Sequence, residues 1–144
     1  MKIGFIGTGS MGSTLVKAFL AAKTCAPSDM IINNRTKSKA DELAANHPGI
    51  VVTDSNVNLV KNADVFFMCI KPGEFRKVLD EIKSCSREDQ IAISITSPVM
   101  IEDLEKWLPC KISKIIPSIT NQALSGTSLY IPGSRMTATD EEWL

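Results

Sequence analysis

The feature that most constrains this chain is a glycine-rich hexapeptide near its start, Gly7-Thr8-Gly9-Ser10-Met11-Gly12. It follows directly on the apolar segment Ile3–Ile6 and precedes a segment whose apolar residues recur at helical spacing. A G-x-G-x-x-G run between a strand and a helix is typical of a dinucleotide-binding βαβ unit. There Gly7 permits the tight turn, Gly9 lets the backbone approach a pyrophosphate, and Gly12 lets the helix pack closely on the strand. The N–H groups at the helix start would hold the phosphates, whereas the alternative is a glycine turn with no ligand.

The rest of the chain alternates short apolar segments with segments of helical periodicity. Strands are expected at residues 3–6, 30–33, 50–52, 65–70, 91–95 and 112–116, and helices at 11–20, 36–46, 57–61, 75–82 and 101–108. The continuous apolar run at 65–70 is typical of a central parallel strand that is covered on both faces. This pattern predicts an α/β fold of the Rossmann type. We expect a doubly wound, mostly parallel sheet of order 3-2-1-4-5-6, with a C-terminal edge strand and helices on both faces.

The end of the second expected strand carries amides and basic groups where many such sites carry an acid. A site for NAD(H) has Asp or Glu about twenty residues after the glycines, to accept hydrogen bonds from the ribose 2′-hydroxyl. This chain has Asn33-Asn34-Arg35-Thr36, with Lys37 and Lys39 beyond. A carboxylate would repel a 2′-phosphate, whereas an amide, a guanidinium and a hydroxyl can all donate to it. The sequence therefore favours NADP(H) as the cofactor, and the alternative is a solvated helix start that Thr36 merely caps.

A third element, Ile70-Lys71-Pro72-Gly73, ends the fourth expected strand. In a 3-2-1-4-5-6 sheet this strand lies beside the first, at the crevice where the strand order reverses and ligands bind. Lys71 would then lie over the nicotinamide half of a bound dinucleotide. The alternative is an exposed lysine that simply follows a strand.

Composition limits the classes of partner and metal. The 144 residues include 16 basic and 16 acidic side chains, so no net positive charge is available for nucleic acid or an anionic membrane. The four cysteines form no C-x-x-C pair and the chain has one histidine, which argues against a zinc site and a disulfide framework. The N-terminal segment is too glycine-rich for a signal peptide, and no apolar run approaches the ~20 residues that span a bilayer. We expect a cytoplasmic protein with a small-molecule ligand and no metal.

The C-terminal residues predict the start of a further helix. Thr139 and Glu142 have the spacing of a capping box, with Thr139 as the N-cap. Trp143-Leu144 would open an amphipathic helix, but a helix of one turn is not stable alone. We therefore expect residues 1–144 to be the dinucleotide-binding domain of a longer protein.

With these residues assembled, the chain resembles the N-terminal domain of pyrroline-5-carboxylate reductases along essentially its whole length. The resemblance rests on segments 3–12, 34–36, 64–67 and 70–72, on Ser94-Ile95, and on the Pro117 segment that leads to Gly126. It implies reduction of a cyclic imine, pyrroline-5-carboxylate, to proline with NADPH. It also implies that the family's helical C-terminal domain, which dimerises and completes the imine pocket, is absent here. A substrate and a homo-oligomer are therefore expected only for the full-length protein.

The resemblance also implies cofactor contacts, to which the glycine motif and the segment after the second strand add Gly12, Arg35 and Thr36. The complete set of candidate cofactor-binding residues is Ile6, Gly7, Thr8, Gly9, Ser10, Met11, Gly12, Asn34, Arg35, Thr36, Asn56, Cys69, Ile70, Lys71, Pro72, Ile95, Thr96 and Ser97. No residue is assigned as catalytic, because in this family the pocket mainly positions a hydride donor against the imine.

Two segments depart from the reductase pattern. Where reductases usually have S-I-x-A-G-V, this chain has Ser94-Ile-Thr-Ser-Pro-Val99, and where they have M-P-N-T-P it has Ile116-Pro-Ser-Ile-Thr-Asn121. Both variants are similar to the late-competence protein (ComER) branch of the family. They suggest an alternative function, a non-catalytic nucleotide-binding regulatory protein of a late-competence pathway. Another two-domain NADP-dependent reductase, such as a β-hydroxyacid dehydrogenase, is a further alternative, against which the missing acid after the second strand and the Pro117 segment argue.

Overall fold

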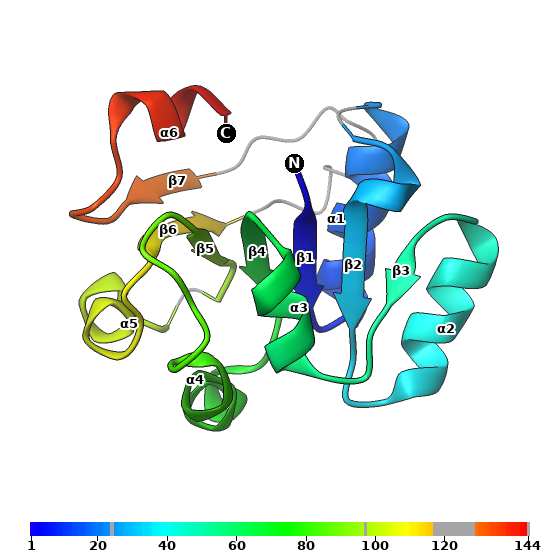
Figure 1. Ribbon diagram of the computed structural model, residues 1–144, viewed down its shortest axis with the longest axis horizontal. Helices are drawn as coiled ribbons and strands as arrows, with labels where there is room; N and C mark the ends of the chain where they lie inside the picture. The colour runs from blue at the N-terminus through cyan, green and yellow to red at the C-terminus, as the bar shows by residue number, and fades with distance from the viewer. Residues whose placement is uncertain (24, 97, 117–128, 144) are drawn as a thin grey trace.

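The computed structural model describes residues 1–23, 25–96, 98–116 and 129–143 (Figure 1). Strands and helices alternate along most of the chain. The strands are β1 (Ile3–Ile6), β2 (Met30–Asn33), β3 (Val51–Val52), β4 (Val65–Met68), β5 (Ile91–Ser94), β6 (Lys111–Ile116) and β7 (Leu129–Pro132). The helices are α1 (Ser10–Ala21), α2 (Lys37–Asn46), α3 (Asn56–Asn62), α4 (Phe75–Ile82), α5 (Ile101–Trp107) and α6 (Ala138–Trp143). Two 3-10 turns, η1 (Pro27–Asp29) and η2 (Pro72–Glu74), precede β2 and α4.

The strands form one sheet of order β3-β2-β1-β4-β5-β6-β7. All pairs are parallel except β6 with β7, which is antiparallel. The predicted Rossmann order is therefore confirmed, together with the edge strand added after the sixth. Because parallel strands need crossovers, the helices between them lie against the faces of the sheet.

The register aligns the carboxyl ends of the central strands. Ile6 at the end of β1 is paired with Asn33 of β2 on one side and with Met68 of β4 on the other. Met68 is in turn paired with Ser94 of β5. The loops that leave these four strands therefore emerge at one edge, which is where ligands bind in open parallel sheets.

Successive side chains of the central strands point to opposite faces and build two apolar cores. Phe66 and Met68 of β4 pack with Leu59 of α3 and with residues of α4 and α5. On the other face, Phe5 and Phe67 stack at 5.0 Å between ring centroids and pack with α1 and α2. A strand that is buried on both faces reads as a continuous apolar run, which is why β4 could be identified from its sequence.

Two boundaries differ from the prediction by two residues, whereas the others differ by one residue at most. The fourth strand ends at Met68, so that the segment from Cys69 to Lys71 belongs to the loop beyond the sheet edge and not to the strand. The last helix begins at Ala138, and its capping box lies two residues earlier than predicted. The Thr137 hydroxyl accepts from the Asp140 N–H at 3.2 Å, while the Asp140 carboxylate accepts from the Thr137 N–H at 2.9 Å.

Tertiary contacts select this earlier capping box. Asp140 is held by Lys111 of β6 at 3.0 Å. Arg135 donates to the carbonyls of Glu105, Leu108 and Cys110, which anchors the segment before the helix to the end of α5. The prediction with Thr139 as N-cap is therefore wrong, because Lys111 and Arg135 decide between two segments of equal spacing.

Among the described helices, none combines the length and apolar character that crossing a membrane requires.

Candidate functional site

A cleft of about 350 Å³ lies at the carboxyl edge of the sheet, between the ends of β1, β2 and β4 and the flank of α4. Most of the predicted contact residues line it: Ile6, Gly7, Gly9, Asn34, Arg35, Thr36, Asn56, Cys69, Ile70 and Lys71. They come from four different loops, and the aligned ends of the strands bring them together. We call this region the cleft below.

Two of the three motif glycines are required by the fold itself. Gly7 has a φ of +97°, which side-chain-bearing residues rarely adopt, and a Cβ there would collide with the carbonyl oxygen of Cys69. A Cβ on Gly12 would collide with the carbonyl oxygen of Gly7. These contacts confirm the tight turn at Gly7 and the close helix–strand packing at Gly12.

Gly9 has no such structural reason to be glycine. Its φ of −69° is available to any residue, and no protein atom lies within 4 Å of the position that a Cβ would occupy. The residue is exposed and lies in front of the N-terminus of α1. The empty space beside Gly9 therefore fits a ligand that approaches the backbone closely.

The N-terminus of α1 can receive an anion. Gly9 is its N-cap, no described side chain caps the helix, and its first turn contains no acidic residue. Such a terminus presents unsatisfied N–H groups and the positive end of the helix dipole. Beside it, the Thr8 hydroxyl is buried and has no hydrogen-bond partner within the described structure. This buried donor and the uncapped terminus fit a phosphate group.

The residues after β2 include groups that hold the loops together and groups that stay available to a ligand. The Asn34 side chain accepts from the Thr8 N–H at 3.0 Å and donates to the Thr36 carbonyl at 3.0 Å. It therefore ties the glycine loop to the end of β2 and keeps one amide hydrogen for a ligand. Thr36 is the N-cap of α2, yet its side chain makes no capping hydrogen bond. The alternative interpretation, in which Thr36 only caps the helix, requires such a hydrogen bond, and the structure does not contain it.

Four residues of the cleft come from η2 and α4 and were not predicted: Glu74, Lys77, Val78 and Glu81. Glu74 pairs with Arg35 at 3.4 Å, and Glu81 accepts from the Asn56 amide at 3.1 Å. Asn56 in turn accepts from Asn33 at 2.7 Å, which connects the ends of β2, α3 and α4 across the cleft. The spacing of these four residues is one helical row. This row shares Val78 with the buried apolar row at 75–82, and its spacing is the signal that could have revealed the four residues.

The segments after β4 and β5 complete the edge. Cys69 lines the cleft, and burial raises the pKa of its thiol, so that the thiol stays protonated and is a poor nucleophile at neutral pH. Lys71 is exposed and lines the cleft, and its place over the nicotinamide half of a dinucleotide stays a prediction. The Thr96 hydroxyl donates to the Ile70 carbonyl at 2.7 Å, which joins the two loops.

Several predicted residues do not line the cleft as the structure describes it. Thr8 is buried within the glycine loop, Met11 and Gly12 lie within α1, Pro72 opens η2, and Ile95 and Thr96 follow the end of β5. Ser97, the side chain of Ser10 and the segment from Pro117 to Gly126 lie outside the described residues.

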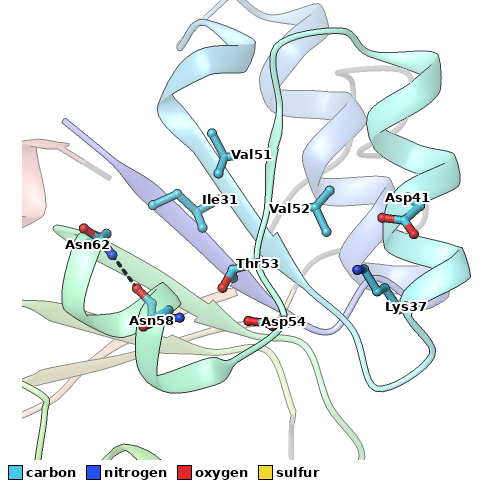
Figure 2. A pocket seen from close by; sticks show the side chains of 9 residues that line it. All are labelled: Ile31, Lys37, Asp41, Val51, Val52, Thr53, Asp54, Asn58 and Asn62. Atoms are coloured by element: carbon cyan, nitrogen blue, oxygen red, sulfur yellow. Dashed lines mark hydrogen bonds between the residues drawn. The ribbon is translucent and has the colours of Figure 1, made fainter.

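A second hollow, of about 590 Å³, lies beside the edge strand β3 (Figure 2). Figure 2 shows Lys37 and Asp41 of α2 on one side and Asn58 and Asn62 of α3 on the other. None of the predicted contact residues lines this hollow. Within the described residues, no group of three His, Cys, Asp or Glu side chains is placed to hold a metal. The cleft is therefore the candidate site.

Comparison with known proteins places the chain in a family. The profile of the family described as NADP oxidoreductase, coenzyme F420-dependent, matches residues 2–98. The chain belongs to this family. ComE operon protein 4 of Bacillus subtilis is 46% identical over 134 residues, which are 93% of this chain and 49% of that protein. Pyrroline-5-carboxylate reductase of Escherichia coli is 30% identical over 143 residues, which are 96% of this chain and 52% of that enzyme.

Solved structures agree on the fold. The crystal structure of Plasmodium falciparum pyrroline carboxylate reductase with NADP bound has a TM-score of 0.87 at 23% identity, covering 99% of this chain and 52% of that one. The predicted resemblance to pyrroline-5-carboxylate reductases and to their late-competence branch is thereby confirmed. The chain spans about half the length of the curated relatives that it matches.

Proposed function

We propose that this chain binds NADP(H) in the cleft, as the cofactor domain of a longer reductase. The observation that carries the proposal is the empty space at Gly9, a position that the fold leaves free for any side chain and that the sequence nevertheless keeps as glycine. A pyrophosphate that approaches the backbone there explains the glycine, because a Cβ would occupy its place.

The other groups of the cleft fit the remaining parts of the cofactor. The N-terminus of α1 and the Thr8 hydroxyl would hold the pyrophosphate, while Arg35, Thr36 and Lys39 would surround a 2′-phosphate. Four basic side chains line the cleft against two acidic ones: Arg35, Lys39, Lys71 and Lys77 against Glu74 and Glu81. This local excess of positive charge suits a polyanionic ligand in a chain whose net charge is zero.

The chemistry follows from the family. The cofactor, when bound, supplies a hydride; the chain's own residues bind it, orient it and fix its position at the sheet edge. Because its relatives include pyrroline-5-carboxylate reductases, we propose a cyclic imine of that type as the substrate of the full-length protein. Residues outside this chain would hold the imine and form a homo-oligomer. We assign no catalytic residue within these 144 residues.

A regulatory function is the second candidate. It is favoured by the 46% identity to ComE operon protein 4, which exceeds the 30% identity to the Escherichia coli reductase. In this alternative the cleft would still bind the dinucleotide, and the bound state would be the signal. In either case we propose a cytoplasmic protein, in which the four cysteines, none of them in a disulfide, stay reduced. The other alternative, a different two-domain NADP-dependent reductase, shares the same cofactor site and differs only in its substrate.

Two measurements test the proposal. Titration of the chain with NADPH and NADH, followed by fluorescence or calorimetry, should show binding of both cofactors and tighter binding of NADPH. Equal affinities, or a preference for NADH, would contradict the 2′-phosphate assignment.

The second measurement is the oxidation of NADPH in the presence of pyrroline-5-carboxylate, with the chain and its full-length parent side by side. We expect turnover only by the parent, because a hydride transfer needs the imine held ~3–3.5 Å from the nicotinamide. Comparable turnover by the chain would show that the catalytic groups lie within it. The absence of NADPH oxidation by both proteins would favour the regulatory alternative.

A further inference from the structure

Arg35 and Glu74 form an ion pair across the mouth of the cleft. The Arg35 guanidinium lies 3.4 Å from the Glu74 carboxylate, and the two side chains are 80% and 33% exposed. Both residues line the cleft, Arg35 from the loop after β2 and Glu74 from η2. A carboxylate therefore occupies one side of the cation on which a 2′-phosphate would depend, although no acid directly follows β2 in the sequence.

We infer that Glu74 sets the balance between NADPH and NADH in this cleft, by competing with the 2′-phosphate for Arg35. The inference rests on the proposed binding of NADP(H) and adds to it the residue that limits the preference. Glu74 does from a neighbouring loop what an acid at the end of β2 does in an NAD site, since its charge opposes a 2′-phosphate and its oxygens can accept from a 2′-hydroxyl.

The opposite effect, in which Glu74 helps NADPH by holding Arg35 in place, is the weaker one. An exposed ion pair with a single contact restricts the Arg35 side chain only slightly, which is equivalent to about a twofold gain in the affinity for NADPH. The repulsion between one carboxylate and a phosphate dianion ~6 Å away corresponds to about a tenfold loss even at the dielectric constant of water. Competition therefore outweighs the gain from positioning, and its effect should fall as salt screens the charges.

The second acid of the cleft, Glu81, does not act in the same way. Glu81 is engaged by the Asn56 amide at 3.1 Å and lies seven positions further along the chain, about two helical turns away from Glu74. Its carboxylate is directed at Asn56, on the α3 side of the cleft, whereas Glu74 is paired with Arg35 itself. Glu74 is therefore the acid to change.

The test is the ratio of the dissociation constants of NADH and NADPH, measured by calorimetry on the chain and on Glu74→Gln. Glutamine keeps the size of the side chain and an oxygen that accepts hydrogen bonds, and it removes the charge. We expect NADPH to bind about tenfold more tightly at low salt and NADH to change by less than about threefold, so that the ratio widens. At high salt the widening should shrink.

The matched control is Asp80→Asn, which removes one negative charge from an exposed position of α4, the helix that follows Glu74 directly. Asp80 is paired with Lys83 and does not line the cleft, so the ratio should stay within about twofold of that of the unchanged chain. Thermal melts of both variants check that the fold is retained.

Two results would overturn the inference: an unchanged or narrowed ratio in Glu74→Gln, as equal shifts for NADPH and NADH would give, or an equal widening of the ratio in the control. The failure of the proposed function looks different, because the unchanged chain would then bind neither dinucleotide. If the unchanged chain prefers NADPH and Glu74→Gln leaves the ratio unchanged, the role assigned to Glu74 is wrong and the proposed binding of NADP(H) stands.

Discussion

The Gly9→Ala substitution separates the demands of the ligand from those of the fold. A Cβ at this position meets no protein atom within 4 Å, and the φ of −69° suits alanine. Replacing glycine reduces the entropy of the unfolded chain and stabilises by about 0.4–1 kcal/mol, while alanine is a poorer N-cap by about the same amount. The free energy of unfolding should therefore change by less than about 0.5 kcal/mol, or about 2 °C in Tm.

The other two motif glycines provide the contrast. Gly7→Ala places a side chain at a φ of +97°, which costs about 1–3 kcal/mol, and adds a collision with the carbonyl oxygen of Cys69. Gly12→Ala adds a collision with the carbonyl oxygen of Gly7. Both neighbours are backbone atoms that cannot rotate away, so we expect each variant to lose about 2–4 kcal/mol and roughly 10 °C in Tm.

The assay combines thermal melts followed by circular dichroism with calorimetric titration of NADPH. Gly9→Ala should melt like the unchanged chain and bind NADPH at least about tenfold more weakly, because the methyl group takes the place of the pyrophosphate. Gly9→Val, with a larger side chain, should abolish binding while the chain stays folded. Unchanged affinity in a folded Gly9→Val variant would refute the reasoning and leave the loop as a simple turn.

Three further predictions concern stability and reactivity. Gln90 is fully buried, donates to the carbonyls of Val60 and Ala63, and accepts from the Arg87 N–H. Gln90→Leu leaves these groups unpaired and should lower the free energy of unfolding, measured by urea denaturation, by about 3 kcal/mol. A loss below ~1 kcal/mol would contradict this account. Partial burial raises the pKa of Asp140, but hydrogen bonds from Lys111 and Thr137 outweigh it and leave the pKa lowered. The stability that this carboxylate contributes is therefore present above its unfolded pKa and lost as the pH falls through the lower folded pKa. Asp140→Asn should lower the free energy of unfolding by about 1 kcal/mol near neutral pH and flatten the decline of that free energy in acid. An unchanged decline in acid would contradict the pairing of Asp140 with Lys111 and Thr137. Because burial raises the pKa of the Cys69 thiol, iodoacetamide should modify it at least about tenfold more slowly in the folded chain than in urea, as mass spectrometry can follow; equal rates would show that the thiol is accessible and ionised.

Much of the fold could be predicted because its signals are local. The strand Val65–Met68 is buried on both faces and so appears as an uninterrupted apolar run. The helix Phe75–Ile82 buries one row of residues and so shows the helical period. The glycine motif follows from the backbone of a single turn and the packing directly beneath it, which the contacts of Gly7 and Gly12 confirm.

The C-terminal capping box shows where local signals stop being sufficient. Thr137 and Thr139 are each followed three residues later by an acid, so that the spacing alone does not choose between them. Lys111 lies on a strand about thirty residues earlier, and its pairing with Asp140 makes the choice. A contact between two segments that are distant in the chain cannot be predicted from the residue pattern of either segment.

The sequence by itself determined the strand order, the glycine loop and the absence of an acid after β2, because each depends on neighbouring residues and on general rules of chain connection. Only the tertiary structure decided which charges face the cleft. The crossover that leads from β4 through α4 to β5 packs α4 beside α3 and brings Glu74 within 3.4 Å of Arg35, thirty-nine positions earlier in the chain. Coulomb interactions depend on distance in space and not on separation in sequence, so the electrostatics of the candidate site could be assigned only after the chain was folded.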